Sequence, residues 1–196
     1  MRRNGLFKVA FPAILVMSTL FLANCTEVKD FFAEVSGTKK SVSGPRAMPK
    51  VFPLLKEIRA REGFYLSDRD PLKASGRFWN NKDTEGNPPA IDGHVFVKGL
   101  CVQSRSEIEY AIEPGYNTFY ALVGNDPAYA EYKGSISFEV YVDGRRQFKS
   151  RPLKASTGDI EEVRIDVSGA KDLVLKVEDN GTATDYAVWA VAKIVK

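Results

Sequence analysis

The chain has 196 residues, 44% of them apolar and 27% charged, which is an ordinary composition for one folded domain with an extension. The formal net charge of +3 arises in residues 1–24, which contain three basic residues and no acidic residue. Without this segment the 28 basic residues fall to 25, equal to the 25 acidic residues. The net charge therefore gives no support for nucleic-acid binding, and we expect none.

Residues 1–24 are typical of a secretory signal peptide, because a basic start is followed by an apolar run of about 15 residues, shorter than the ~20 that span a bilayer. The segment ends in LFLANC, which resembles a bacterial lipobox, although Asn24 stands where Gly, Ala or Ser is usual. We therefore predict an exported lipoprotein of a bacterial cell envelope, anchored to a membrane through a lipid on Cys25. The alternative is ordinary cleavage nearby, which gives a secreted or periplasmic protein.

Residues 25–50 show no persistent period and become rich in Ser, Gly, Lys and Pro, which predicts a flexible tether. Residues 51–62 are predicted to form a short helix before the folded domain. Pro53 suits its first turn, and Gly63 suits the position just past its end. An apolar face could dock this helix onto the domain through Leu54, Leu55 and Ile58.

Residues 63–196 are predicted to form an antiparallel β domain, because apolar and polar residues alternate in several short segments. These segments are EIEYAI (107–112), SISFEVYV (135–142), EEVRIDV (161–167) and DLVLKVED (172–179). Asp143-Gly144 would join two strands in a hairpin, since both residues tolerate positive φ. The last segment, DYAVWAVAKIV (185–195), is apolar on both faces and therefore indicates a central strand. The pattern favours a β-sandwich or jelly roll and excludes a doubly wound fold.

Seven segments of this region follow one another in the order of a known family. They are FYLSDRD, WNNKDTEG, IDGHVFVKGLCVQSRSEIEYAI, FYALVGND, GSISFEVYVDGRRQFKS, EEVRIDVSGAKDLVLKVEDNG and DYAVWAVAKI. The set resembles the NPCBM family, a carbohydrate-binding module found beside family 98 glycoside hydrolases, and covers residues 63–196. The resemblance implies a jelly roll similar to galactose-binding domains. It also implies non-catalytic binding of galactose-containing or related glycans, with a structural metal ion in some members.

Two motifs depart from the family pattern. The family stretch usually reads Lys-Gly-(Ile or Leu)-Gly-x-His-(Ala or Ser)-x-Ser-Glu, and Gln103 stands where this pattern has His. The family's closing motif resembles Asp-His-Ala-Asp-Trp-Ala-Asp-Ala, whereas residues 185–192 read DYAVWAVA and lack one His and two Asp. The framework is kept while polar groups have changed, which supports the fold more than the usual ligand.

Sugar recognition needs a flat aromatic surface and planar polar groups that hold two hydroxyls at once. Trp79 is the best platform, because it lies in a predicted polar loop with Asn81; its alternative role is to close one end of the sandwich. Gln103 and Arg105 offer donors near a strand start but would equally suit a solvent-facing position. Trp189 is expected in the core. The remaining candidates are Asn125, Asp126 and Tyr129, in a predicted loop that could rim the same end as residues 79–83, and Asp185 and Tyr186 of the closing motif.

No cofactor is required by these assignments, but a structural calcium ion is left open. Calcium needs several oxygen ligands, and Asp68, Asp70 and Asp126 are the candidates for such a metal site. Cys101 lies between apolar neighbours and is expected to be a small buried hydrophobe. The sequence contains no phosphate-binding loop, zinc-ligand spacing or Gly-x-Ser-x-Gly motif, so we do not expect an enzyme.

Two functions remain in competition. In the first, the chain is a non-catalytic carbohydrate-binding module that holds a glycan or polysaccharide through its end loops. In the second, the same fold has lost sugar binding and acts as a structural module or binds a protein partner of the envelope. The retained Trp79 favours the first, and the altered polar positions favour the second.

Overall fold

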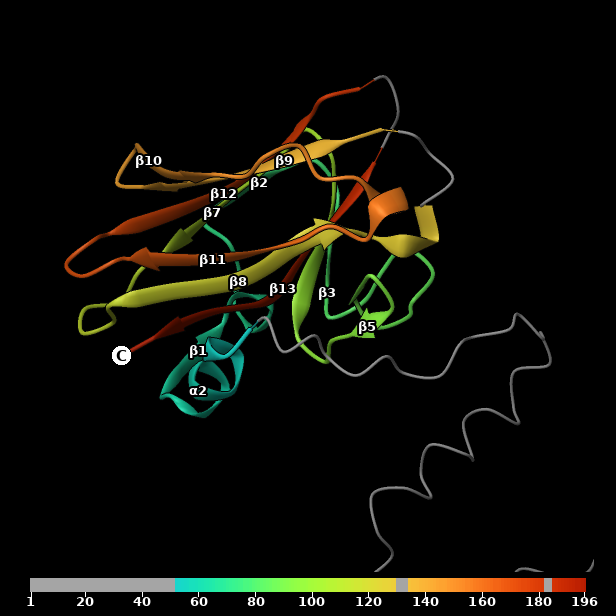
Figure 1. Ribbon diagram of the computed structural model, residues 1–196. Coiled ribbons are helices and arrows are strands. Elements are labelled where there is room, and N and C mark those ends of the chain that lie inside the picture. The colour runs from blue at the N-terminus through green and yellow to red at the C-terminus, as the bar shows by residue number, and fades with distance from the viewer. Residues whose placement is uncertain (1–51, 130–133, 182–184) are drawn as a thin grey trace, which may run out of the picture. The chain divides into compact units, whose positions relative to one another are not determined.

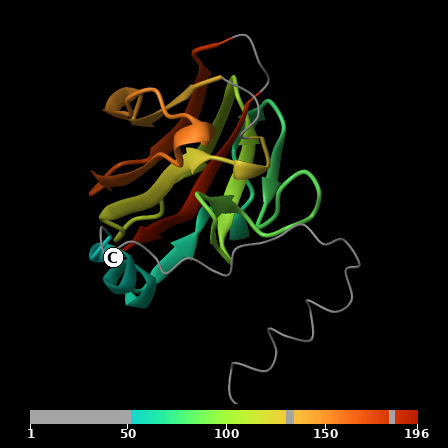
Figure 2. The same ribbon diagram turned by 45° about the vertical axis from the view of Figure 1, so that its right-hand side comes forward.

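Two antiparallel sheets are stacked face to face in the computed structural model, which describes residues 52–129, 134–181 and 185–196 (Figures 1 and 2). The predicted signal peptide, Cys25 and the predicted tether lie outside the described residues. None of the described helices is long and apolar enough to cross a membrane. The predicted antiparallel β-sandwich is confirmed.

Each sheet combines strands from distant parts of the sequence. Sheet A runs in the order β11 (Ile160–Asp166), β8 (Thr118–Asn125), β13 (Tyr186–Val195), β6 (Gly99–Gln103) and β3 (Phe78–Asn80), with β1 (Gly63–Tyr65) also paired to β13. Sheet B runs in the order β10 (Arg145–Lys149), β9 (Ile136–Val142), β12 (Asp172–Asp179), β7 (Ser106–Ala111) and β2 (Lys73–Ser75). A small hairpin of β4 (Ala90–Ile91) and β5 (His94–Val95) and three 3-10 turns, η1 (Leu66–Asp68), η2 (Pro127–Tyr129) and η3 (Ala155–Thr157), complete the described structure.

Apolar side chains from both sheets fill the space between them. Trp189 of β13 is 1% exposed, and its ring meets Phe138 of β9 edge to face, with centroids 4.9 Å apart. This contact joins the two sheets and places Trp189 in the core, as predicted. β13 lies between β8 and β6, which confirms its central position.

The outer face of sheet A is also apolar, and two elements cover it at opposite ends (Figure 1). Helix α2 (Leu54–Ala60) packs Leu55 and Ile58 against one end, which confirms the predicted short helix. The β4–β5 hairpin and the residue after it pack Ile91 and Phe96 against the other end. The central strands of sheet A, β8 and β13, are therefore buried on both faces, which explains the continuous apolar sequence of β13.

Lys193 of β13 fastens α2 to the sheet. Its ammonium group donates hydrogen bonds to the carbonyl oxygens of Ile58 at 3.0 Å, Arg59 at 3.2 Å and Arg61 at 2.7 Å. These carbonyls belong to the C-terminal end of the helix, where a helix leaves carbonyls without internal partners. A cation here also complements the negative end of the helix dipole.

Gly63 does not end the helix, so that part of the sequence interpretation was wrong. The helix is capped by Arg61 in an extended conformation, and Gly63 begins β1. A Cβ atom on Gly63 would lie 2.1 Å from the carbonyl oxygen of Ile194. Glycine is needed here because β1 approaches β13 closely, not because the chain turns.

Two connections position the ends of the strands. Asp143 and Gly144 have φ values of 47° and 72°, which confirms the predicted tight hairpin between β9 and β10. Ser104 and Arg105 join β6 in sheet A to β7 in sheet B, and Arg105 has a φ of 62°. Gln103 is therefore the last residue of a sheet A strand, at the point where the chain crosses the sandwich.

Candidate functional site

Trp79 and Tyr186 form an aromatic pair on the outer face of sheet A. Their ring centroids are 5.9 Å apart, with an interplanar angle of 49°. Trp79 lies on β3 and Tyr186 on β13, and β6 runs between these two strands. Both side chains are half-buried, so part of each ring remains available to a ligand. Trp79 is in a strand rather than in the loop that the polar sequence indicated.

Gln103 lies beside this pair. It is directly opposite Tyr186 in the register of β6 and β13, and Cys101 is directly opposite Trp79 in the register of β6 and β3. Residues two apart on a strand share a face, so Gln103 lies on the same outer face as Cys101. Its half-buried amide can donate and accept hydrogen bonds beside the two rings.

Asp126 lies beside Tyr186, at the same end of sheet A as the aromatic pair. It follows β8, its amide donates to the carbonyl of Tyr186 at 3.0 Å, and its carboxylate accepts from the amide of Ala128 at 3.0 Å. Burial, together with Asp83 and Glu85, raises the pKa of the Asp126 carboxyl. The structure thus brings the residues after β8 and the residues after β3 to one end.

The 83–87 loop owes its shape to Asp83. The Asp83 carboxylate accepts from the amides of Glu85 and Asn87, both at 2.8 Å, and from the side chain of Asn87 at 3.1 Å. Side-chain acceptors of this kind hold short loops without a sheet partner. The 83–87 loop therefore has a defined conformation, and its carboxylates lie near Asp126.

Three other predicted sugar-binding residues form a second group at or beside the ends of strands: Arg105, Asn125 and Asp185. Arg105 pairs with Asp179 of sheet B at 3.1 Å. Asp185 is 2% exposed, and burial, together with Asp179, raises its pKa. Asn125 is the last residue of β8, not a loop residue. In the described part of the chain, neither the side-chain oxygen of Asn125 nor Oδ2 of Asp185 has a hydrogen-bond partner. Tyr129 ends η2, three residues beyond Asp126.

Asn81 belongs to neither group. Its backbone amide donates to the carbonyl of Gly99, and its side-chain oxygen accepts from the amide of Gly99 at 3.2 Å. Asn80, the last residue of β3, pairs with Leu100, so Asn81 lies just past the end of β3, roughly 7 Å from Trp79 at about 3.3 Å per residue. Its φ of 59° and its bonds indicate that Asn81 shapes the chain after β3.

The three predicted metal ligands do not come together. Asp68 pairs with Lys98 and accepts from Asn81 at 3.5 Å, whereas the acidic neighbours of Asp126 are Asp83 and Glu85. Across residues 52–129, 134–181 and 185–196 there is no group of three or more His, Cys, Asp or Glu side chains placed to hold a metal ion. The described residues thus do not fit the predicted calcium site, and we assign the site no metal chemistry.

The chain folds as an antiparallel β-sandwich with an aromatic pair on one outer face, and a family model identifies its class. The model of the NPCBM/NEW2 domain matches residues 62–195. This match covers more than half of the chain, so the chain belongs to the NPCBM/NEW2 family, as its resemblance indicated. A comparison with curated proteins found no match.

Solved structures from Clostridium perfringens are similar to this chain. The CBM51 module of GH95 in complex with methyl-galactose is 29% identical, with a TM-score of 0.64, and the match covers 68% of this chain and 100% of that one. The CBM51-2 and INT domains of ZmpB are 31% identical, with a TM-score of 0.64, and a second structure of them with GlcNAc is 32% identical, with a TM-score of 0.63. In both, the match covers 69% of this chain but only 32% of the ZmpB chain.

The departures from the family pattern lie together on the outer face of sheet A. The two positions that carry His in the pattern are Gln103 and Tyr186, which are directly opposite each other. The next opposed pair on this face, Cys101 and Val188, occupies positions that carry Gly and Asp in the pattern. The changes are therefore paired across β6 and β13, a relation that sequence reasoning missed because the register of distant strands is not visible in a single sequence.

Val191 is the other position that has lost Asp. It has a φ of 54° at the irregular part of β13, and its amide donates to the carbonyl of Lys98 at 2.9 Å. Asp and Asn adopt this left-handed conformation more readily than a β-branched residue does. Val191 therefore holds a backbone conformation that its own side chain disfavours.

Proposed function

We propose that this chain is a non-catalytic module that binds galactose-containing or related glycans through the Trp79–Tyr186 face. The observation that carries the proposal is the half-buried aromatic pair beside Gln103 at the end of sheet A. The similar C. perfringens modules, whose structures include methyl-galactose and GlcNAc, support this ligand class.

The chemistry of the face suits one sugar ring. A pyranose has an apolar face of C–H groups that can lie against the ring of Trp79 or Tyr186. The Gln103 amide can then bond two neighbouring hydroxyls, as donor and as acceptor. Because each hydroxyl exchanges bonds with water for bonds with protein, the net gain is about 1 kcal/mol per bond, and we expect millimolar to micromolar affinity.

The face lacks an activated nucleophile among the residues that form it. Cys101 lies beneath the pair, and burial, with Asp126 and Asp83 nearby, raises the pKa of its thiol. A catalytic thiol needs the opposite shift, since the thiolate is the reactive form. This supports binding without turnover.

The location proposal concerns the N-terminal segment. We propose export and attachment to a bacterial envelope through a lipid on Cys25, on the basis of the sequence of residues 1–25. Metabolic labelling with a fatty acid should mark the protein, and Cys25→Ser should abolish the label. Labelling that persists in this variant would contradict the proposal.

Calorimetric titration with methyl-galactose and GlcNAc tests the sugar site. Trp79→Ala should weaken binding by about fivefold to tenfold, because it removes stacking worth about 1 to 1.4 kcal/mol. Tyr116→Ala is the matched control, since Tyr116 is also a half-buried aromatic and contacts Phe64 near β1. Equal weakening in both variants, or no binding of any sugar by the wild type, would contradict the proposal.

One observation favours the second candidate function, a protein-binding or structural module. Val188 and Val191 replace two Asp of the family pattern, which makes this face less polar than the pattern implies. A glycan array without any signal, together with capture of one specific envelope protein that Trp79→Ala abolishes, would establish this alternative.

A further inference from the structure

The edge of sheet B carries a concentrated positive charge. Residues 145–158 contain five basic residues and no acidic residue, although the chain after residue 24 has equal numbers of both. β10 lies at the end of the sheet and pairs only with β9 (Figure 1). The basic residues of this edge, all exposed, are Arg145, Arg146, Lys149, Arg151 and Lys154.

A β-bulge in β10 gathers two of these cations on one face. Arg146 pairs with Tyr141 of β9 and Phe148 pairs with Val140, so Gln147 is an extra residue in the register. The extra residue lets Arg146 and Lys149 lie on the outer face while Phe148 packs against the core. Without the bulge, strict alternation would place Arg146 and Phe148 on the same face.

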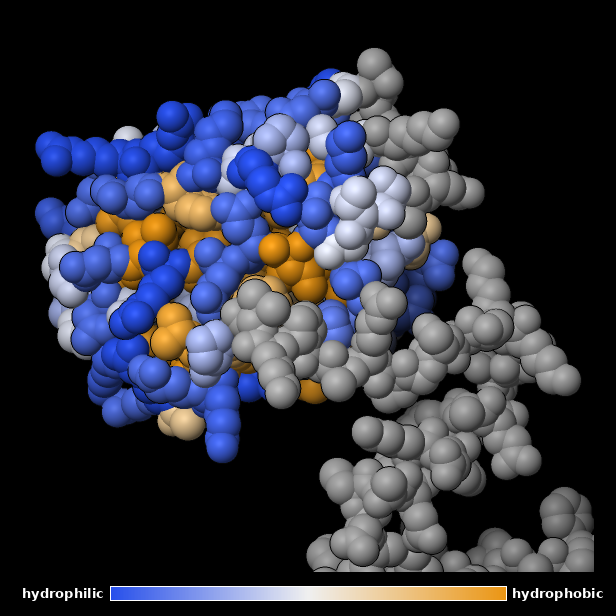
Figure 3. Space-filling model, viewed as in Figure 1, coloured by the Kyte–Doolittle hydropathy of each residue, from blue (hydrophilic) through white to orange (hydrophobic). Residues whose placement is uncertain are grey.

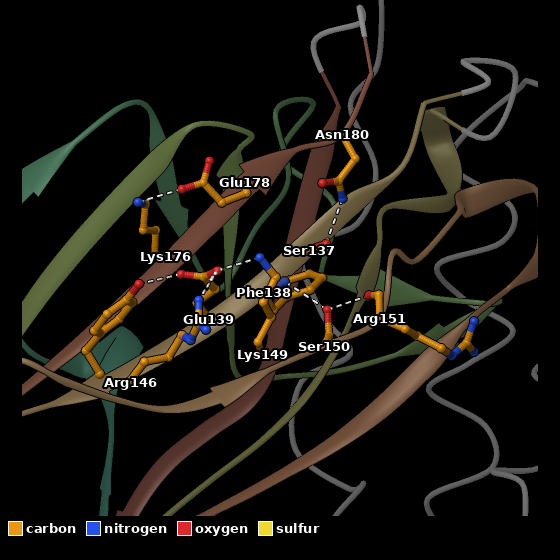
Figure 4. A network of polar contacts seen from close by, with 11 residues as sticks. Ser137, Phe138, Glu139, Arg146, Lys149, Ser150, Arg151, Lys176, Glu178 and Asn180 are labelled. Carbon is orange, nitrogen blue, oxygen red and sulfur yellow. Dashed lines mark hydrogen bonds and ion pairs between the residues drawn. The ribbon is translucent and has the colours of Figure 1, made fainter.

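Both cations converge on one buried carboxylate (Figure 4). Arg146 at 3.3 Å and Lys149 at 2.9 Å contact the same oxygen of Glu139, whose side chain is 4% exposed. Tyr141 donates a hydrogen bond to the other oxygen at 2.6 Å. One negative charge thus holds two positive charges within about 6 Å of each other, and one positive charge remains in excess.

The remaining cations add to this excess. Arg151 is neutralised by Asp159 at 3.0 Å. Arg145 and Lys154 make no side-chain ion pair in the described part of the chain. The region of β10 is strongly hydrophilic in the space-filling view, at the upper left (Figure 3). The edge therefore presents about three uncompensated positive charges, two of them on β10 and the third on Lys154, which follows the strand.

The side chains around the cations indicate the kind of polyanion. Proteins that hold single-stranded nucleic acid commonly offer exposed aromatic rings for stacking, and the ring of Phe148 on this edge is turned into the core. A membrane surface would need exposed apolar groups beside the cations, and the exposed large apolar residues of the described chain are Leu72, Val95 and Val97, none of them on β10. Polar, ordered cations alone suit a hydrated polymer with carboxylate or sulfate groups.

We propose that the basic edge, formed by Arg145, Arg146, Lys149 and Lys154, binds an anionic polysaccharide. Each arginine can bind a carboxylate or sulfate with two N–H groups. The lysines add point charges, Lys149 on β10 and Lys154 in the segment after it. The choice of a polysaccharide as the carrier of the charge rests on the proposed function. The edge lies on sheet B, so it is separate from the aromatic pair on sheet A.

Binding of the full chain to immobilised heparin, polygalacturonate and neutral galactan tests this proposal. The double variant Arg145→Ser/Lys154→Ser removes two cations that hold no buried partner, so the fold should be kept. We expect its affinity for the two anionic polymers to fall at least about fivefold at low salt. The slope of log affinity against log salt should become shallower by roughly 2, one for each lost contact.

The matched control is Lys56→Ser/Arg164→Ser, which removes the same charge from exposed positions on α2 and β11. An equal loss in both double variants would reduce the effect to net charge and overturn the proposal. Absence of binding to either anionic polymer, or tighter binding to single-stranded DNA or phosphatidylglycerol vesicles, would also overturn it. Sugar titration of the same proteins distinguishes the two proposals. If the wild type binds heparin but no sugar, the result contradicts only the proposed sugar site at Trp79 and Tyr186.

Discussion

The outer faces of the two sheets solve the problem of exposure in different ways. Sheet A hides the apolar part of its outer face beneath α2 and the β4–β5 hairpin, and the Trp79–Tyr186 pair at one end stays half-buried. Sheet B has no such cover in the described structure. Its outer face is polar and carries ion pairs, two of which join Arg146 and Lys149 to Glu139. An apolar outer face, as on sheet A, must be covered, and aromatic rings are then exposed only where the cover ends. A charged outer face, as on sheet B, can remain exposed to solvent along its whole length.

The cover of sheet A should be the more sensitive of the two to a single substitution. Lys193→Met removes three hydrogen bonds from a cation to the carbonyls at the end of α2. We expect the free energy of unfolding to fall by about 3 kcal/mol, measured by urea denaturation. Lys196→Met, which removes an exposed ion pair with Glu62, should have a much smaller effect. Similar losses in the two variants would show that Lys193 does not fasten the helix.

A substitution on the polar face of sheet B should lower the free energy of unfolding by less, and the loss should depend on pH. Glu139→Gln keeps the shape but removes the charge that Arg146 and Lys149 share, and we expect a loss of about 1–2 kcal/mol at pH 7. Denaturation curves of both proteins between pH 3 and pH 7 provide the measurement.

The sign of the pH effect follows from the pKa of Glu139. Burial would raise this pKa, but the hydrogen bonds from Tyr141 and Lys149 outweigh burial and hold it below its ordinary value of 4.5. The stabilisation is therefore complete above about pH 4.5 and is lost as the pH falls through the lower folded-state value. The difference between wild type and Glu139→Gln should narrow under acid, and a constant difference would contradict this account.

Restoring the family pattern tests whether the Trp79–Tyr186 end of sheet A binds the sugar. Gln103 and Tyr186 face each other, so Gln103→His/Tyr186→His returns both members of one opposed pair. If one hydrogen bond to the sugar is gained, galactose affinity should rise about fivefold, since a bond is worth about 1 kcal/mol. Each single variant should gain less than half of this free energy because the partners act together. Unchanged affinity in the double variant would mean that the pair does not contact the sugar.

Calcium should have the smallest effect on either face. Asp68 is already paired with Lys98, and the predicted ligands do not converge. Millimolar calcium should leave the Tm unchanged to within about 1 °C, whereas a bound ion at 100 times its Kd would add about 2.7 kcal/mol of stability. A Tm rise of several degrees, reversed by a chelator, would contradict the absence of a calcium site from the described residues.

Much of the sandwich could be predicted because alternation along a strand is local. The segments that became β7, β9, β11, β12 and β13 all show a period of two or a doubly apolar pattern, and Asp143-Gly144 marks its turn directly. The polar neighbours of Trp79 predict a loop, whereas the structure has a strand of only three residues there, β3. So short a strand forms only because β6 offers it a partner.

The site was less predictable because its geometry depends on pairs of distant strands. Nothing local shows that Gln103 faces Tyr186, 83 positions later in the chain. The polar face of β9 reads as solvent-exposed, yet Glu139 is buried by cations that a bulge in β10 turns toward it. Register and bulges are tertiary features, and a single sequence records them only indirectly.

The pairing of β1 with β13 bears on how the molecule would respond to mechanical load. A pull on the chain before Phe52 would reach the sandwich through α2 and then through β1, which runs antiparallel to the last residues of β13. Gly63 lies opposite Val195, at the end of β13 remote from Tyr186. Tension between the predicted tether and the proposed ligand at Tyr186 would then load these hydrogen bonds in shear, so that they resist together instead of opening one after another.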